Sequence, residues 1–299
     1  MHHYDIVVGH GLLSSTDLDP LAELKVEFPR SWVITDRNVW SLHGERLMQV
    51  IDRSRWVAGV LILEPGEPTK SLDGWQQALD WAAAHKVQRR DLLLAFGGSV
   101  ITDLVGFVAS SYMRGVAYAN LPTTLLAQVD GSMGGKVAVN TATAKNLVGA
   151  FHHPEAVMCD SRLLATLPRA EIANGLSEAI KTFTIESTEA FEFLERHVPA
   201  CLDGDLDRLT HVVRLCASIK MHLLDPDPYE VDLRRVLNFG HTLGHPIETS
   251  HAYRDIRHGE AVAIGMSAAV RIGLARGITD TSFARRFLEL LELTELPTS

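Results

Sequence analysis

Short apolar runs rich in β-branched residues alternate with helical patterns in the first half of the chain. Apolar residues recur at helical spacing from Leu72 to Ala82, so residues 71–86 are predicted as a helix. The predicted strands are 5–8, 32–35, 57–63, 91–96 and 116–121, and residues 104–111 form a second predicted helix. This alternation predicts a parallel or mixed sheet that is covered by helices.

Helical periodicity dominates the second half of the chain. Strand signals fade near Thr166, and the helices predicted beyond it are 169–183, 209–223 and 233–248. A chain of 299 residues fits one large or two ordinary domains. We therefore expect an α/β domain over residues 1–165 and an all-α domain over residues 166–299.

Composition narrows the class of protein. The chain is 46% hydrophobic and has a net charge of −9, which argues against a nucleic-acid surface and makes a local cluster of cations informative. No apolar run reaches the length of a membrane span, and no secretory leader is expected. Three cysteines without metal or redox spacing indicate reduced thiols in a cytoplasmic protein.

Histidines gather near residue 240. His241 and His245 are four residues apart and would share one face of a helix, with His258 close downstream. With 14 histidines in the chain, any single one could be a surface or core residue, but the cluster indicates a metal site. Gly240 and Gly244 would allow close approach of a ligand or of another backbone.

A glycine-rich turn follows the predicted strand 91–96. Gly97, Gly98 and Ser99 lead toward a helix, where free backbone N–H groups and the helix dipole favour a phosphate. The turn is not a G-x-G-x-x-G fingerprint, and tight turns also use glycine for steric reasons alone.

Residues 128–146 combine glycines with polar side chains. Lys136, Lys145 and Asn146 could donate to an anion, and Asp130 could accept from a hydroxyl. Interleaved Ala and Val favour a largely buried segment, and a solvated surface loop is the alternative.

The ordered set of motifs from about Asp36 to the end of the chain resembles the 3-dehydroquinate synthase family of sugar-phosphate cyclases. Each motif is weak alone, whereas their common order is highly specific. The motifs are residues 65–70, 97–98 with 103, 112–115, 122–130, 134–136, 145–146, 178–181, 238–245 and 258–260.

The resemblance implies an N-terminal NAD-binding α/β domain, a C-terminal helical domain, an active site in the cleft between them, and a homodimer. It implies a zinc or cobalt site made by Glu178, His241 and His258. The implied NAD-binding residues are Asp36, Glu67, Lys70, Gly98, Ser99, Val100, Asp103, Thr123, Thr124, Lys136 and Lys145. The implied catalytic and substrate-binding residues are Arg114, Asp130, Lys136, Asn146, Lys181, Lys220, Arg234 and His245.

The implied substrate is 3-deoxy-D-arabino-heptulosonate 7-phosphate, a keto-acid sugar phosphate whose two anionic groups suit lysine and arginine. By the same resemblance, NAD transiently oxidises a ring hydroxyl held by the metal, phosphate is eliminated, the ketone is reduced again, and the ring closes. The enzyme would thus be a carbon–oxygen lyase that forms 3-dehydroquinate in the shikimate pathway. Arg234 would hold the carboxylate, and His245 could move a proton.

Three alternatives remain at this stage. One is another cyclase, of secondary metabolism, whose substrate lacks the carboxylate. The second is a metal-dependent polyol dehydrogenase, which would produce NADH. The third is a catalytically impaired homologue, supported by Ser99 and Pro246 where the family differs and by the end of the sequence at Ser299, before a further basic motif of the family.

Overall fold

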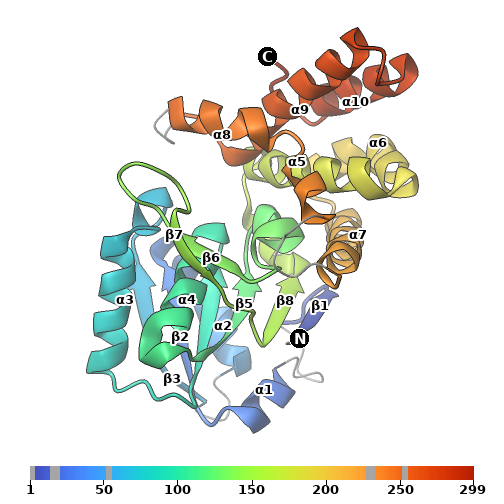
Figure 1. Cartoon of the computed structure of the whole chain (residues 1–299). Coiled ribbons are helices and arrows are strands. Elements are labelled where there is room, and N and C mark those ends of the chain that lie inside the picture. The colour runs from blue at the N-terminus through green and yellow to red at the C-terminus, as the bar shows by residue number, and fades with distance from the viewer. Residues whose placement is uncertain (1–3, 14–20, 52–55, 227–232, 251–254) are drawn as a thin grey trace. The chain divides into compact units, whose positions relative to one another are not determined.

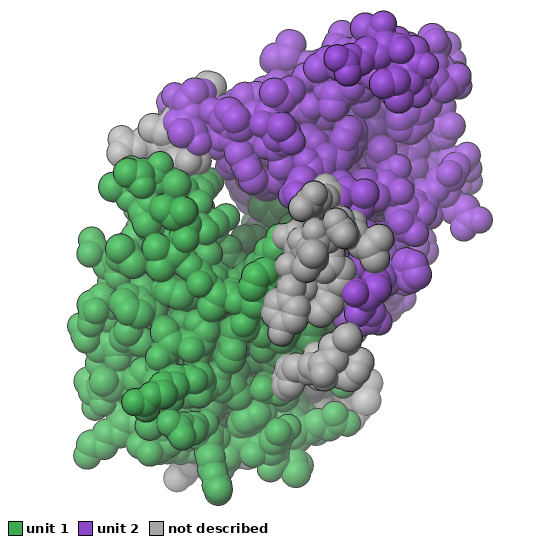
Figure 2. All heavy atoms as spheres, viewed as in Figure 1, with its two compact units in different colours: residues 1–166 green, residues 167–299 purple. Residues whose placement is uncertain are grey.

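The computed structural model describes residues 4–13, 21–51, 56–226, 233–250 and 255–299. It divides the chain into two compact units, Met1–Thr166 and Leu167–Ser299, which Figure 2 shows in different colours. The division lies one residue after the boundary expected from the sequence. The binding roles expected for the two domains stay predictions.

The first unit contains a six-stranded sheet in which every neighbouring pair of strands is parallel, with the order β1-β8-β5-β4-β2-β3 (Figure 1). The expected covered parallel sheet is therefore confirmed. The strands are β1 (Asp5–Gly9), β2 (Ser31–Asp36), β3 (Val57–Leu63), β4 (Leu92–Gly97), β5 (Ala117–Pro122) and β8 (Ala156–Asp160).

Helices and short turns connect these strands. The α-helices of this unit are α1 (Ala22–Glu27), α2 (Arg37–Ile51), α3 (Leu72–Ala84) and α4 (Ser99–Ser111). The shorter elements are η2 (Glu67–Thr69), η3 (Tyr112–Arg114), the short π-helix η4 (Ala127–Gly131) and η5 (Ser161–Thr166). Helix α4 begins at Ser99, five residues before its predicted start, so the glycine-rich turn leads directly into it.

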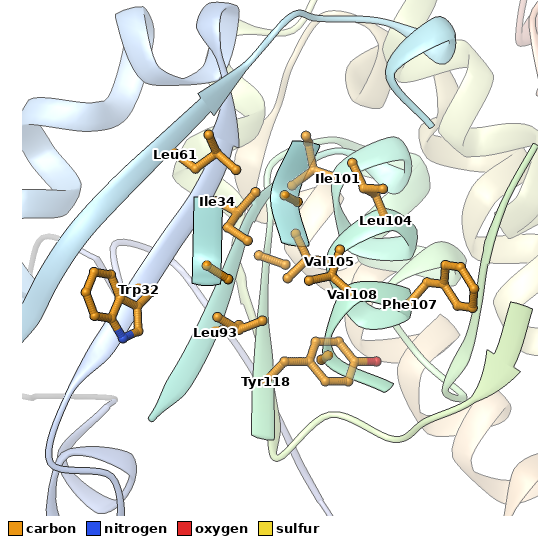
Figure 3. Close-up of a cluster of buried hydrophobic side chains, with 14 of the residues drawn as sticks. Trp32, Ile34, Leu61, Leu93, Ile101, Leu104, Val105, Phe107, Val108 and Tyr118 are labelled. Carbon is orange, nitrogen blue, oxygen red and sulfur yellow. The ribbon is translucent and has the colours of Figure 1, made fainter. Parts of the chain in front are cut away.

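Strand β4 shows why the sheet is buried on both faces. Leu93 and Ala95 belong to the apolar cluster that includes α3 and α4, part of which Figure 3 shows. Leu92, Leu94 and Phe96 belong to the opposite cluster, with residues of α1 and α2. A run of apolar residues on consecutive positions is typical of such a central parallel strand.

A two-stranded antiparallel hairpin, β6 (Lys136–Val139) and β7 (Val148–Phe151), packs against α4. Val137 and Val139 are buried, but Lys136 and Asn146 are exposed. The expectation that residues 128–146 are largely buried is therefore wrong beyond Asn140. Alternate side chains of a strand point to opposite faces, and residues 142–149 include the exposed connection between the two strands.

The second unit is helical throughout its described residues. Its elements are α5 (Arg169–Glu186), α6 (Thr188–Leu202), α7 (Leu206–Leu224), η6 (Leu233–Asn238), α8 (His241–Ser250), α9 (His258–Ala275) and α10 (Thr281–Leu293). The single helix predicted over 233–248 is interrupted before His241, because Gly240 adopts the left-handed region with φ +82°. Helix α8 continues through Pro246. Within the described ranges, no helix is long and apolar enough to cross a membrane.

Candidate functional site

Three potential metal ligands meet inside the second unit. Glu178 lies on the buried side of α5, and His241 and His258 are the first residues of α8 and α9. The Nε2 atoms of His241 and His258 lie 3.6 and 3.5 Å from Oε1 of Glu178. The potential ligand atoms of the three residues all lie within 4.8 Å of one another.

These distances fit a bound divalent ion. Zinc bonds of about 2.0–2.2 Å in tetrahedral geometry separate neighbouring ligand atoms by roughly 3.3–3.6 Å. Two imidazole nitrogens and one carboxylate oxygen are also a common donor set for catalytic zinc, because three protein ligands leave a position for substrate.

Glycines bring the helices of this site close together. A Cβ added to Gly265 of α9 would lie 1.9 Å from the carbonyl oxygen of Gly240, just before α8. A Cβ added to Gly259 would lie 2.3 Å from the carbonyl oxygen of Asn174 on α5. The sequence allowed either a ligand or another backbone to approach Gly240. In the structure, the backbone of α9 occupies the space beside this residue.

The start of α9 is fixed on α5 by two hydrogen bonds. The backbone N–H of Gly259 donates to Asn174 Oδ1 at 2.7 Å, and the Ser177 hydroxyl donates to the Gly259 carbonyl at 2.7 Å. Neither polar residue was predicted from the sequence. The sequence signal that could have indicated them is their position on the same helix as Glu178, with Asn174 four residues and Ser177 one residue before it. The two bonds place His258 beside the Glu178 carboxylate.

The electrostatic environment differs between the two histidines. Burial lowers the pKa of His241, which favours the neutral imidazole that binds metals. Burial also disfavours the charged form of His258, but hydrogen bonds to Glu178 and Glu248 raise its pKa to about 9. Glu248, a buried residue of α8 that was not predicted, places Oε2 3.2 Å from His258 Nδ1. In the metal-free site, the charged imidazole of His258 therefore lies between two carboxylates, those of Glu178 and Glu248.

Several predicted substrate residues accompany this cluster. Lys181 is buried and forms an ion pair with Oε2 of Glu178. The ring centroid of His245 lies 5.1 Å from that of His241. Lys220 is buried on α7, which packs against α5. The side chain of Arg234 lies outside the described residues, although its backbone belongs to η6.

A second candidate site lies in the first unit, at the carboxyl edge of the sheet. From β2 the chain adds β3 on one side and then returns to form β4 on the other side of β2. The carboxyl ends of strands at such a reversal are the usual ligand-binding position of open parallel sheets. Asp36 ends β2, Gly98 follows β4, and Thr123 follows β5, so three predicted NAD-binding residues belong to this edge.

The turn after β4 has groups ready for an anion. The N–H groups of Ser99 and Val100, the first residues of α4, have no acceptor among the hydrogen bonds of the described residues. The hydroxyl oxygens of Ser99 and Thr123 are buried and likewise lack a partner there. Unpaired buried polar atoms are costly, so these four groups fit a ligand that carries hydrogen-bonding oxygens.

Charged residues predicted for NAD binding lie in one network beside this turn. Lys70 is buried and forms an ion pair with Asp103 of α4. Burial raises the pKa of Asp103, and the Lys70 ammonium group opposes that rise. Lys145 Nζ lies 3.6 Å from Oε1 of Glu67 in η2.

Asn140 joins the parts of this network, and the sequence did not indicate it. Its N–H donates to the Lys70 carbonyl at 2.9 Å, and its side-chain Nδ2 donates to Glu67 Oε1 at 2.8 Å. Its Oδ1 accepts from the N–H of Asn146 at 3.0 Å. Asn140 therefore positions both η2 and the turn that carries Lys145.

The other predicted residues of the first unit are more scattered. Thr124 Oγ1 accepts from the Ala127 N–H at 3.2 Å, and Asp130 lies within η4. Arg114 is exposed in a left-handed conformation, with φ +68°. Helix α4 leads from the carboxyl edge of the sheet to its amino edge, about 20 Å away, and Arg114 follows that helix. The structure therefore does not bring Arg114 to the edge that carries Asp36.

Comparisons with known proteins indicate the family of the chain. The family model described as 3-dehydroquinate synthase N-terminal matches residues 60–174, and the one described as 3-dehydroquinate synthase C-terminal matches residues 175–299. The chain is 40% identical over 281 residues to the 3-dehydroquinate synthase of Thermoanaerobacter pseudethanolicus, covering 94% of this chain and 79% of the relative.

Two further relatives are named as synthases of epi-valiolones. The 2-epi-valiolone synthase of Actinosynnema mirum is 45% identical over 271 residues, covering 90% of this chain and 70% of the relative. The solved structure of 2-epi-5-epi-valiolone synthase from Streptomyces hygroscopicus, with NAD+ and Zn2+ bound, superposes with a TM-score of 0.92 at 30% identity. That superposition covers 99% of this chain and 82% of the solved chain.

Proposed function

Because the chain belongs to the 3-dehydroquinate synthase family of sugar-phosphate cyclases, we propose that it converts 3-deoxy-D-arabino-heptulosonate 7-phosphate into 3-dehydroquinate and phosphate. In this role it would act as a carbon–oxygen lyase of the shikimate pathway and as a homodimer, with NAD and a divalent metal ion as cofactors. The observation that carries the proposal is the meeting of Glu178, His241 and His258 within a chain of this family.

The metal would be held by Oε1 of Glu178 and by the Nε2 atoms of His241 and His258. When bound, Zn2+ or Co2+ would supply Lewis acidity to a hydroxyl oxygen of the substrate. Lys181 pairs with the second oxygen of Glu178, which leaves the first oxygen directed to the two imidazoles. The structure of the Streptomyces hygroscopicus relative, which contains Zn2+, supports this assignment.

NAD would be held at the carboxyl edge of the sheet. The free N–H groups of Ser99 and Val100 suit its diphosphate, and the carboxylate of Asp36 suits ribose hydroxyls. NAD, when bound, would accept a hydride and later return it. The further residues proposed for this site are Glu67, Lys70, Gly98, Asp103, Thr123, Thr124, Lys136 and Lys145.

The substrate requires cationic partners for its carboxylate and phosphate. Lys181 and Lys220 are buried lysines, which suit anions held away from water. The exposed imidazole of His245, beside His241, would accept or return a proton near the reacting hydroxyl. We propose that Asp130, Lys136, Asn146 and Arg234 complete the substrate site.

A second candidate is a cyclase of the 2-epi-valiolone synthase type. The 45% identity to the Actinosynnema mirum relative favours it, since that value exceeds the 40% to the 3-dehydroquinate synthase. The two candidates share the cofactors and differ in whether the sugar phosphate carries a carboxylate.

The test is an assay of phosphate release on two substrates, the keto-acid phosphate and a heptulose 7-phosphate without the carboxylate. Release from the keto-acid phosphate should require NAD, stop when a chelator removes the metal, and leave no lasting NADH absorbance. Preference for the carboxylate-free sugar would transfer the assignment to the second candidate. NADH formed in proportion to turnover would identify a dehydrogenase instead.

A further inference from the structure

We propose that Glu248 is a positioning residue of the metal site, which holds the His258 imidazole so that Nε2 faces Glu178. The inference rests on the metal-binding part of the proposed function. It concerns a residue outside the three ligands, and its consequences can be measured without turnover.

Each ring nitrogen of His258 faces a different carboxylate. Nδ1 lies 3.2 Å from Oε2 of Glu248, and Nε2 lies 3.5 Å from Oε1 of Glu178. An imidazole that donates through Nδ1 presents the lone pair of Nε2 to a metal, so the hydrogen bond to Glu248 selects the tautomer that the site needs.

The burial of Glu248 indicates a specific role. Its side chain is 2% exposed, and a carboxylate withdrawn from water is costly unless a charged or hydrogen-bonding partner compensates. Glu248 is not among the residues whose donor atoms gather around the proposed metal position, which are Glu178, His241 and His258. It contacts that group through His258.

The register of α8 explains how the residue reaches its partner. His241, His245 and Glu248 stand at positions i, i+4 and i+7 and so share one face of the helix. Helices α8 and α9 approach closely at Gly244, where an added Cβ would lie only 3.1 Å from the Ala261 carbonyl oxygen. Helix α8 therefore supplies the proposed ligand His241 and, two turns later, Glu248, which orients the proposed ligand His258 of α9.

A purely structural contact between α8 and α9 is the competing explanation. It predicts that loss of the carboxylate lowers the thermal stability of the metal-free protein and leaves the intrinsic metal affinity unchanged. Positioning predicts weaker metal binding of about 10- to 100-fold, the usual effect of removing such a partner of a metal-bound histidine. It also predicts an altered visible spectrum of the Co2+-substituted protein, because the histidine ligand is reoriented.

The experiment compares wild type with Glu248→Ala, Glu248→Gln and the control Glu289→Gln, an exposed carboxylate of α10. Zn2+ affinity is measured by competition with a chromophoric chelator, and NAD affinity reports on the first unit. We expect about 10- to 100-fold weaker Zn2+ binding for Glu248→Ala. The loss should be smaller for Glu248→Gln, whose amide oxygen can still accept, and NAD affinity should be unchanged throughout.

Wild-type Zn2+ affinity in Glu248→Ala would overturn the inference. If the alanine variant does not fold, Glu248→Gln with both wild-type Zn2+ affinity and an unaltered Co2+ spectrum would overturn it. A wild-type protein that binds Zn2+ but acts on neither sugar phosphate would refute the proposed reaction and leave the role of Glu248 intact. A wild-type protein that binds no Zn2+ would refute both.

Discussion

His241 and His258 stand at the first positions of two successive helices, and their ring centroids lie 5.3 Å apart. The contact between α8 and α9, together with the hydrogen bonds that hold Gly259 on α5, positions both rings, so a change to either ring or to these contacts should weaken metal binding.

Replacing His241 by alanine should abolish retention of one divalent ion per chain and abolish turnover. The reason is that a carboxylate and a single imidazole remain, which is a weak set for zinc. Metal content by mass spectrometry and circular dichroism of the purified variant test this outcome. Full activity of the wild-type protein after complete chelation would contradict the metal assignment.

Replacing Gly265 by alanine should destabilise the second unit and weaken metal binding together. The new Cβ would meet the Gly240 carbonyl oxygen, a backbone atom that cannot move without displacing α8. Overpacking of this kind costs about 1–3 kcal/mol, which thermal unfolding can measure. Gly273→Ala is the matched control on α9, since its Cβ would meet the side-chain oxygen of Thr279. Equal losses in the two variants would argue against the role given to the backbone contact.

Replacing Asn140 by alanine should weaken NAD binding by about tenfold, the effect of losing a hydrogen bond to a charged group. Glu67 and the turn before Asn146 would both lose the side chain that positions them. Isothermal titration with NAD measures the effect, and Thr143→Ala, in the same exposed turn, serves as control. An unchanged NAD affinity would place the dinucleotide away from this network.

His43 should make stability depend on pH. Burial lowers its pKa below the ordinary value of 6.5, with Arg46 as a second cause. As the pH falls, His43 therefore takes up a proton in the unfolded chain before it does so in the folded protein. The stability that neutral His43 contributes above pH 6.5 is lost as the pH falls below that value. In His43→Gln, the slope of unfolding free energy against pH should be flatter than in wild type, by at most about 1.4 kcal/mol per pH unit. Identical slopes from denaturant titrations at several pH values would refute the prediction.

Arg234 and Arg235 test which sugar phosphate is the substrate. If Arg234 holds the carboxylate, Arg234→Ala should lose a charge-assisted bond of about 1.5–3 kcal/mol. That loss corresponds to roughly a tenfold to hundredfold drop in kcat/KM on the keto-acid phosphate. Arg235→Ala is the adjacent control and should cost little. An unaffected Arg234→Ala enzyme would favour the cyclase that acts on a carboxylate-free sugar.

The sequence allowed the prediction of features that depend on neighbouring residues. The apolar runs identified the parallel strands, and the spacing of His241, His245 and His258 indicated a metal site. Of these three histidines, His241 and His258 belong to the group of potential ligands in the structure. The resemblance added Glu178, which periodicity alone treats as half of an ordinary ion pair.

Features that depend on packing between distant segments could not be predicted. Glu248 reaches His258 only because α8 and α9 lie in close contact, and no local pattern distinguishes it from other glutamates. The break before His241 required the left-handed backbone of Gly240. The exposure of Lys136 depends on which face of the hairpin α4 covers, and the separation of Arg114 from Asp36 depends on the direction of α4.

The origin of the three proposed ligands on separate helices has a consequence for folding. An ion bound to α5, α8 and α9 would be a cross-link that closes long loops of the chain, and such links reduce the conformational entropy of the unfolded state. An ion present at a thousand times its dissociation constant adds about 4.1 kcal/mol to the stability of the native state. Metal supply would then govern how long the helical unit survives heat and proteolysis, independently of any substrate.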